Sequence, residues 1–134
     1  MIISRTPFRI SFVGGGTDIR SFYSEEPGQV LSTSIDKYIY VVVKRQIGIV
    51  EYKYRVNWSK VEFSNRIGDI EHPIVRESLQ LLGIDFPIEI TTFSDIPGST
   101  GLGSSSAFTV GLLHALYALK GQMVTKHTLA CKAA

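Results

Sequence analysis

The sequence predicts an α+β domain in which helices pack on a mixed or antiparallel sheet. Apolar and polar residues alternate with a period of two over several short segments, as in half-buried strands. Other segments space their apolar residues three to four positions apart, as helices do. Strands and helices do not alternate one for one, which disfavours a purely parallel sheet. The 134 residues fit one domain whose core needs neither disulfides nor a metal.

The first predicted strand covers residues 2–13 and places Phe8, Ile10 and Phe12 on one face. Pro7 lacks a backbone N–H and predicts an edge position or a break there. Three glycines, 14–16, end the strand. A short irregular or helical connection over residues 19–28 follows.

Four more strands are expected before the first long helix. Residues 29–35 and 38–46 are interpreted as two strands joined by a turn at Asp36-Lys37. Residues 49–54 and 58–64 have the same alternation. We therefore expect an antiparallel meander with one side facing solvent.

The second half of the chain alternates helix and strand. Residues 71–83 predict an amphipathic helix that ends at Gly83, and residues 86–93 predict a strand. The helix over 104–120 is apolar nearly all round, so we expect it to be buried, with His114 as a core histidine. Thr125 can cap a final helix.

Composition excludes several classes of protein. Charged residues make up 19% of the chain, so it is not disordered, and no apolar run is long enough to span a membrane. The first residues lack the features of a signal peptide, and the single Cys131 cannot form an internal disulfide. These features predict a cytoplasmic protein. The net charge of +2 permits an anionic ligand without predicting nucleic acid.

Basic and aromatic residues interleave between positions 37 and 60. This pattern fits an RNA-binding face, or the solvated face of an antiparallel sheet with aromatic cross-strand pairs. We favour the second interpretation because Glu51 and Glu62 lie in the same strands. The residues are Lys37, Lys44, Arg45, Lys53, Arg55 and Lys60, with Tyr38, Tyr40, Tyr52, Tyr54 and Trp58.

A loop of small residues joins a predicted strand to the long helix. A helix N-terminus carries unpaired N–H groups and partial positive charge, and glycines let a ligand approach the backbone closely. Serine hydroxyls can bind phosphate oxygens or magnesium. A phosphate site or an ordinary helix cap would both fit these residues. The loop comprises Pro97, Gly98, Ser99, Thr100, Gly101, Leu102, Gly103, Ser104, Ser105 and Ser106.

A second motif closes the first strand, where three glycines precede Thr17 and Asp18. Asp18 could accept hydrogen bonds from sugar hydroxyls, and Arg9 on the strand could hold an anion. Alternatively, Asp18 caps the following segment and Arg9 is a solvated strand residue.

Together, the two motifs identify a family resemblance. Residues 97–105 match the P-x-x-x-G-L-G-S-S loop of the GHMP small-molecule kinases position for position. Residues 7–18 are similar to the P-x-R-I-S-F-x-G-G-G-T-D opening of the bacterial D-glycero-D-manno-heptose 7-phosphate kinases, the branch of the family that the sequence resembles most. Tyr23–Glu26 and Ile35–Tyr38 also resemble that branch.

The resemblance implies a ribosomal protein S5 domain 2-like fold over residues 1–134, the N-terminal ATP-binding domain of such kinases. It implies ATP and Mg²⁺ as cofactors, bound by the loop of residues 97–106, with Ser105 as metal ligand. It implies a sugar phosphate as partner, held by Gly15, Gly16, Thr17 and Asp18, with Arg9 as the catalytic residue near the transferred phosphoryl group. The implied reaction phosphorylates the anomeric hydroxyl of heptose 7-phosphate to the 1,7-bisphosphate, and no nucleic acid or membrane is expected as partner.

The family's catalytic aspartate and third glycine-rich motif lie in later segments without a counterpart here. We therefore expect a truncated chain that lacks the C-terminal GHMP domain and has little or no kinase activity alone. It could form homo-oligomers through the surface left uncovered. Two alternatives stay open: another GHMP sugar kinase, similar to fucokinase or galactokinase, and a non-catalytic S5-like domain that binds RNA or a partner protein.

Overall fold

The computed structural model describes residues 1–17, 19–98 and 100–133. Its five strands form one mixed sheet in the order β1-β2-β5-β3-β4, which confirms the predicted α+β class. The elements in chain order are β1 (Ile2–Val13), α1 (Arg20–Tyr23), β2 (Leu31–Arg45), β3 (Tyr54–Asn57), β4 (Val61–Ser64), the 3₁₀ helix η1 (Ile67–Asp69), α2 (Pro73–Leu81), β5 (Ile88–Ser94), α3 (Ser104–Leu119) and α4 (Lys126–Ala133).

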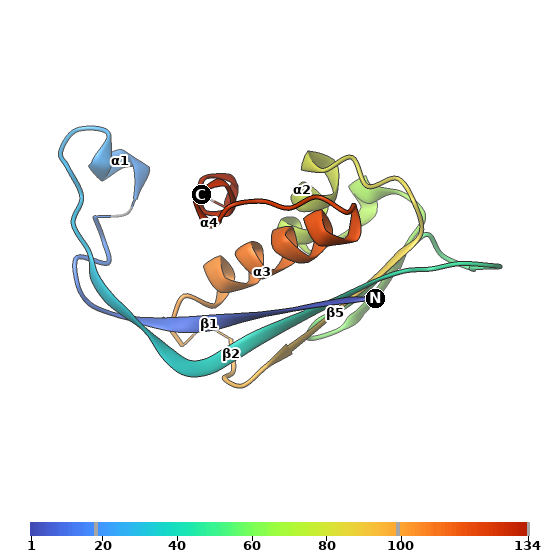
Figure 1. The fold of residues 1–134 in the computed structure, drawn as a ribbon, viewed down its shortest axis with the longest axis horizontal. Helices are drawn as coiled ribbons and strands as arrows, with labels where there is room; N and C mark the ends of the chain where they lie inside the picture. Colours follow the sequence, from blue (N-terminus) through green and yellow to red (C-terminus); the bar gives the residue numbers. More distant parts are fainter. Residues whose placement is uncertain (18, 99, 134) are drawn as a thin grey trace.

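The longer helices α2, α3 and α4 lie on one face of the sheet, and the ribbon shows no helix on the other face (Figure 1). The core lies between them, where Val41 and Ile90 of the central strands and Leu112 and Leu116 of α3 are fully buried. Burial of such side chains contributes about 1.5–3 kcal/mol each.

Helix α3 approaches β1 closely at Gly111. The Ser4 hydroxyl donates a hydrogen bond to the Gly111 carbonyl at 2.8 Å. A Cβ atom on Gly111 would lie only 2.8 Å from Thr6 Oγ1. Glycine at this position therefore sets the depth at which α3 packs on the sheet.

The prediction that α3 is buried holds for the side that faces the sheet, including Ala107, Phe108 and Leu113. His114 is exposed, so its expected place in the core is wrong. The reason is that α3 covers one face of a single sheet, so one side of the helix stays open to solvent.

Two strand predictions are wrong in their boundaries. β2 is one continuous strand with no turn at Asp36-Lys37. Its pairing with β1 shifts there, because Pro7 pairs with Tyr38 while Arg9 pairs with Ser34. The extra residues of β2 form a bulge at the place where Figure 1 shows the strand bending.

The expected antiparallel meander is also wrong. Residues 49–53 form no strand, and β3 begins at Tyr54. β5 is inserted between β2 and β3, and it pairs with β3 in parallel. A parallel pair needs a long crossover connection, which β4, η1 and α2 supply between β3 and β5.

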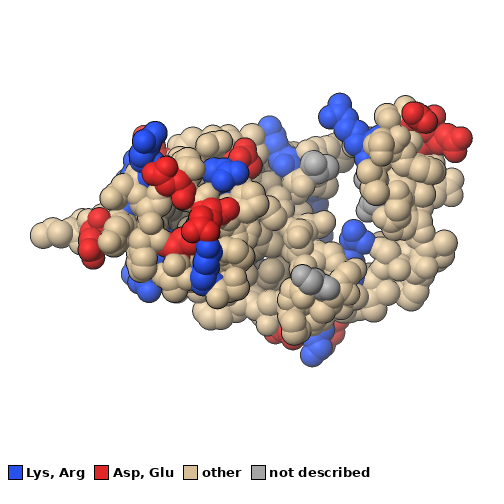
Figure 2. All heavy atoms as spheres, turned by 180° about the vertical axis from the view of Figure 1, so that it is seen from behind, with Lys and Arg blue, Asp and Glu red and all other residues tan. Residues whose placement is uncertain are grey.

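The distal parts of β1 and β2 form a two-stranded arm, residues 10–17 and 19–33, that projects from the body and carries α1 (Figure 1). From behind, an open space separates the arm from the rest of the molecule, and most of the arm's surface is uncharged (Figure 2). Its exposed large apolar side chains are Ile10, Phe12, Val13, Ile19, Phe22, Tyr23, Val30 and Leu31.

Within residues 1–17, 19–98 and 100–133, every helix is too short or too polar to cross a membrane.

Candidate functional site

The glycine-rich loop turns directly into α3. Gly101 and Gly103 both have φ of 74°, in the left-handed region that favours glycine. Gly103 is the N-cap of α3, and its carbonyl accepts the bond from Ala107 N at 2.9 Å. Within the described residues, the amide N–H groups of Ser104, Ser105 and Ser106 have no acceptor. These groups can therefore bind an anion.

The structure brings Arg9 of the first motif against this loop. Arg9 N donates to Leu102 O at 3.3 Å, so the loop is hydrogen-bonded to β1. A Cβ atom on Gly103 would lie 3.1 Å from Arg9 Cγ and 3.2 Å from Arg9 Nε. The Arg9 side chain thus lies over the start of α3, with its guanidinium also donating to Ser11 Oγ. The structure thus brings two segments about 90 residues apart in sequence into contact.

The other first-motif residues lie in the turn of the arm. Gly15 and Gly16 are exposed, and Thr17 is half-buried. Thr17 Oγ1 donates to Gly14 O at 2.8 Å and accepts from Gln29 N at 3.1 Å. The Thr17 hydroxyl therefore closes the turn onto the start of β2. Its predicted contact with substrate stays a prediction, and the predicted ligand Asp18 lies outside the described residues.

A Cβ atom on Gly14 would lie 1.9 Å from Gln29 O, and one on Gly28 would lie 2.3 Å from Thr17 O. Because only glycine permits both approaches, the path of the backbone around Gly15 and Gly16 is sterically constrained.

Within the loop, Pro97, Gly98, Thr100 and Gly101 are exposed, and Ser99 lies outside the described residues. Leu102 packs against the core, so it can offer a ligand only its backbone. Ser105 is exposed, and its carbonyl accepts a bond from Thr109 Oγ1 at 2.8 Å. In the part of the chain that the structure describes, the Ser105 hydroxyl has no hydrogen-bond partner and is available to a ligand.

A pocket of about 900 Å³ opens beside the loop. Ligand pockets for small molecules typically have volumes of about 300–1,000 Å³. Its lining comes from the strands β2 and β5, the turn between β3 and β4, the starts of α2 and α3, and the loop, namely Ile39, Trp58, Ser59, His72, Pro73, Ile74, Thr92, Ser94, Asp95, Ile96, Pro97, Gly98, Ser104, Ser105 and Phe108.

Three aromatic rings form one wall of this pocket. The His72 ring centroid lies 4.8 Å from that of Trp58 and 5.0 Å from that of Phe108. The buried Glu62 carboxylate holds Trp58 of this wall and the backbone next to His72, accepting from Trp58 Nε1 at 2.6 Å and from Glu71 N at 2.7 Å. Burial lowers the pKa of His72, although the Glu62 carboxylate opposes this by favouring the imidazolium.

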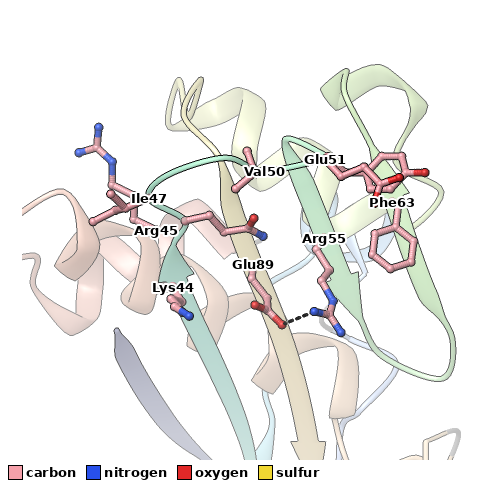
Figure 3. Close-up of a pocket in the computed structure, with 10 residues that line it drawn as sticks. Lys44, Arg45, Ile47, Val50, Glu51, Arg55, Phe63 and Glu89 are labelled. Atoms are coloured by element: carbon pink, nitrogen blue, oxygen red, sulfur yellow. Dashed lines mark ion pairs between the residues drawn. The ribbon is translucent and has the colours of Figure 1, made fainter.

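A second pocket, of about 400 Å³, lies at the end of the sheet remote from both motifs. Figure 3 shows Arg55 and Glu89 pointing toward one another from adjacent strands, with Phe63 beside them. Their ion pair, Arg55 Nη1 to Glu89 Oε1, measures 3.5 Å. The charge of Arg55 is therefore compensated within the pocket by Glu89.

The structure places the residues of the basic-aromatic run 37–60 in different environments. Tyr54 is buried, and Trp58 lines the larger pocket. Lys60 is paired with Glu71. No continuous basic-aromatic surface follows from these positions.

The pocket wall of Trp58, His72 and Phe108 was missed by sequence reasoning, which assigned Trp58 to a sheet surface. One local signal was present: His72 precedes Pro73, and proline is favoured at the first position of a helix. That signal identifies His72 as a cap but does not place it in a pocket.

Comparisons with known proteins agree with this geometry. The family described as GHMP kinases N terminal domain matches residues 70–134. The chain is 32% identical over 123 residues to D-glycero-alpha-D-manno-heptose 7-phosphate kinase of Campylobacter jejuni, covering 85% of this chain and 36% of that protein. It thus spans about a third of this curated relative.

Solved structures show the same fold. A D-glycero-D-manno-heptose 1-phosphate kinase from Bacteroides thetaiotaomicron superposes with a TM-score of 0.77 at 20% identity, over 99% of this chain and 46% of that one. Lactococcus lactis galactokinase complexed with galactose gives a TM-score of 0.67 at 19% identity, over 98% and 36% of the two chains. The chain spans less than half of either protein.

Proposed function

The chain carries the N-terminal domain of a GHMP kinase, and from this premise we propose that it binds the triphosphate of Mg-ATP for phosphoryl transfer to a sugar phosphate. The observation that carries the proposal is the start of α3, where N–H groups without an acceptor among the described residues, the Ser105 hydroxyl and the Arg9 side chain lie beside a pocket of about 900 Å³. Phosphoryl transfer depends mainly on positioning and on charge neutralisation, which these groups can provide.

The residues at the start of α3 fit ATP and Mg²⁺, the two ligands that the family resemblance implies. Anionic phosphates are stabilised at a helix N-terminus, and the Ser104–Ser106 N–H groups are available there. Mg²⁺ bound to a nucleotide usually takes phosphate oxygens, waters and one or two protein oxygens. The Ser105 hydroxyl is such an oxygen at the pocket edge. When bound, the ion would neutralise charge that develops on the phosphates.

We propose Arg9 and the first-motif residues 14–18 as the acceptor side of the site. A guanidinium over the start of α3 can orient an anionic substrate and the phosphates together. The acceptor we propose is D-glycero-D-manno-heptose 7-phosphate, phosphorylated at its anomeric hydroxyl. The 32% identity to a heptose 7-phosphate kinase supports this choice over a neutral sugar.

Binding measurements on the 134-residue chain test the proposal. We expect Mg-ATP to bind with one-to-one stoichiometry in calorimetry, and heptose 7-phosphate to bind more tightly than galactose or fucose. Arg9→Ala should weaken heptose 7-phosphate binding. Arg5→Ala is the matched control, because Arg5 lies on the same strand and stacks instead on Tyr38, at 4.4 Å.

Other outcomes would contradict the proposal in different ways. Tighter binding of a neutral sugar would indicate another sugar kinase. Salt-sensitive binding of single-stranded RNA without any nucleotide binding would favour the non-catalytic alternative. Normal turnover by this chain in a magnesium-dependent ADP-release assay would overturn the expected low activity.

We also propose that the arm mediates self-association. Monomers seldom expose apolar patches larger than a few hundred Å². Phe12, Val13 and Leu31 are each more than 60% exposed. Sedimentation velocity should show association that Phe12→Ser with Leu31→Ser reduces. A concentration-independent monomer would refute this proposal.

A further inference from the structure

His72 is held in one tautomer by its place at the start of α2. Its Nδ1 accepts a hydrogen bond from Val75 N at 3.5 Å, as the N-cap of the helix. A ring nitrogen that accepts a bond carries no proton, so in neutral His72 the proton resides on Nε2. The helix cap therefore makes Nε2 a hydrogen-bond donor.

The ring itself is fixed in the pocket wall. Trp58 meets it edge-on, with an interplanar angle of 78°, and Phe108 contacts it at 47°. Trp58 is in turn held by the buried Glu62 carboxylate at 2.6 Å. A ring restrained in this way can present a donor in a fixed direction with little loss of conformational entropy on binding.

The donor is unused within residues 1–17, 19–98 and 100–133. In the part of the chain that the structure describes, His72 Nε2 has no hydrogen-bond partner. Among those residues, the buried side-chain nitrogen and oxygen atoms that lack a partner comprise Asn57 Oδ1 alone, so His72 Nε2 is accessible. Because His72 lines the pocket, its donor is available to a ligand there.

We propose that His72 Nε2 donates a hydrogen bond to an acceptor ring nitrogen of a purine base bound in this pocket, and so contributes to selection of the nucleotide. The inference rests on the proposed binding of a nucleoside triphosphate by the loop. Phe108 lies one turn along α3 from Ser104 and lines the same pocket, so the nucleoside of a triphosphate bound at the start of α3 can reach the aromatic wall. The aromatic wall can pack against the base, and the His72 donor selects a base edge that carries an acceptor nitrogen.

The charged surroundings of His72 support a neutral ring. Burial lowers the pKa of the imidazole, and the Glu62 carboxylate of β4 raises it by a smaller amount. Glu71 precedes His72 in the chain and is paired with Lys60, and the α3 side chain that meets the ring is the uncharged Phe108. The lowered pKa favours the neutral ring, which is the form that the cap requires.

Calorimetry with ATP and with inorganic tripolyphosphate separates base recognition from phosphate binding. His72→Asn keeps a capping acceptor, since asparagine is among the best N-cap residues, but removes the ring and its donor. We expect ATP affinity to fall about 3- to 10-fold, the usual range for one hydrogen bond. Tripolyphosphate affinity should not change. Thr125→Ala is the matched control. Thr125 also caps a helix, since its Oγ1 accepts a hydrogen bond from Thr128 N of α4 at 3.1 Å, but it does not line this pocket.

Deaza analogues identify the acceptor atom. Among 1-, 3- and 7-deaza-ATP, one should bind the wild type about 3- to 10-fold more weakly than ATP and bind His72→Asn as well as ATP does. An unchanged ATP affinity in His72→Asn would overturn the inference, as would an equal loss for ATP and tripolyphosphate. If the wild type binds neither ligand, the proposed function itself fails.

Discussion

Replacing Gly103 by alanine tests whether the loop and the Arg9 side chain act as one site. Gly103 has φ 74° and ψ 30°, and a non-glycine residue in this left-handed region costs about 1–2 kcal/mol. The new Cβ would also lie 3.1 Å from Arg9 Cγ, which is tighter than an ordinary contact. Arg9 must then move, although its backbone is hydrogen-bonded to Leu102.

Gly121→Ala is the matched control. Gly121 has φ 72°, and nothing lies within 4 Å of the position its Cβ would take. Both variants should lose about 1 kcal/mol or more of unfolding free energy, which is about 4 °C in Tm for a domain of this size. The strain is common to both, but only Gly103→Ala displaces Arg9.

The decisive assay is therefore binding rather than stability. We expect Gly103→Ala to weaken Mg-ATP and heptose 7-phosphate binding several-fold, while Gly121→Ala leaves both unchanged. Thermal unfolding of the two variants confirms that the comparison is made at equal strain. Equal affinities in the two variants, or an unchanged Tm in both, would refute this reasoning.

Three further predictions concern the metal ligand, helix packing and pH. Ser105→Ala should weaken ATP binding about 3- to 10-fold with Mg²⁺ present and leave it unchanged in EDTA, because the lost hydroxyl acts through the ion. Calorimetry under both conditions measures the two affinities. Equal losses of affinity with and without Mg²⁺ would exclude the role of Ser105 as a metal ligand. Gly111→Ala should lower the urea midpoint of unfolding. A Cβ 2.8 Å from Thr6 Oγ1 costs about 1–3 kcal/mol, against a gain of about 1 kcal/mol in helix propensity. An unchanged or higher midpoint would contradict the packing argument. Burial lowers the pKa of His72 below its ordinary value of 6.5, so the unfolded chain binds a proton at His72 more tightly than the folded chain does. The free energy of unfolding should therefore fall as pH drops from about 6.5 through the folded pKa. Urea titrations of His72→Asn should show a smaller fall than the wild type, and an identical pH profile would be inconsistent with that shift.

Local sequence signals predicted the helices well. The predicted helix over 71–83 corresponds to α2 (Pro73–Leu81), and that over 104–120 to α3 (Ser104–Leu119). Thr125 caps the last helix as expected, through Thr128 N. Helix spacing, proline at the start and glycine at the end are encoded within a few residues, so they can be identified without tertiary contacts.

The strands were predicted less well because their pairing is not local. Asp36-Lys37 has the composition of a turn, but its residues are accommodated as a bulge in β2 because β1 pairs on both sides of it. Residues 49–54 alternate like a strand, yet Ile49 is fully exposed, since β5 occupies the place beside β2 that a meander would give them. Which strand occupies which position depends on the crossover through α2.

For the candidate site, the sequence by itself determined the loop, because the left-handed turns at Gly101 and Gly103 and the hydroxyls that follow are properties of consecutive residues. It also determined that Arg9 and the glycines of the first motif belong with the loop, through a family resemblance. Only the tertiary structure decided that Arg9 lies over Gly103 and that Trp58, His72 and Phe108 form one pocket wall. The physical reason is that the sheet order and the packing of α3 bring together residues from four separate segments, and no short-range pattern encodes those distances.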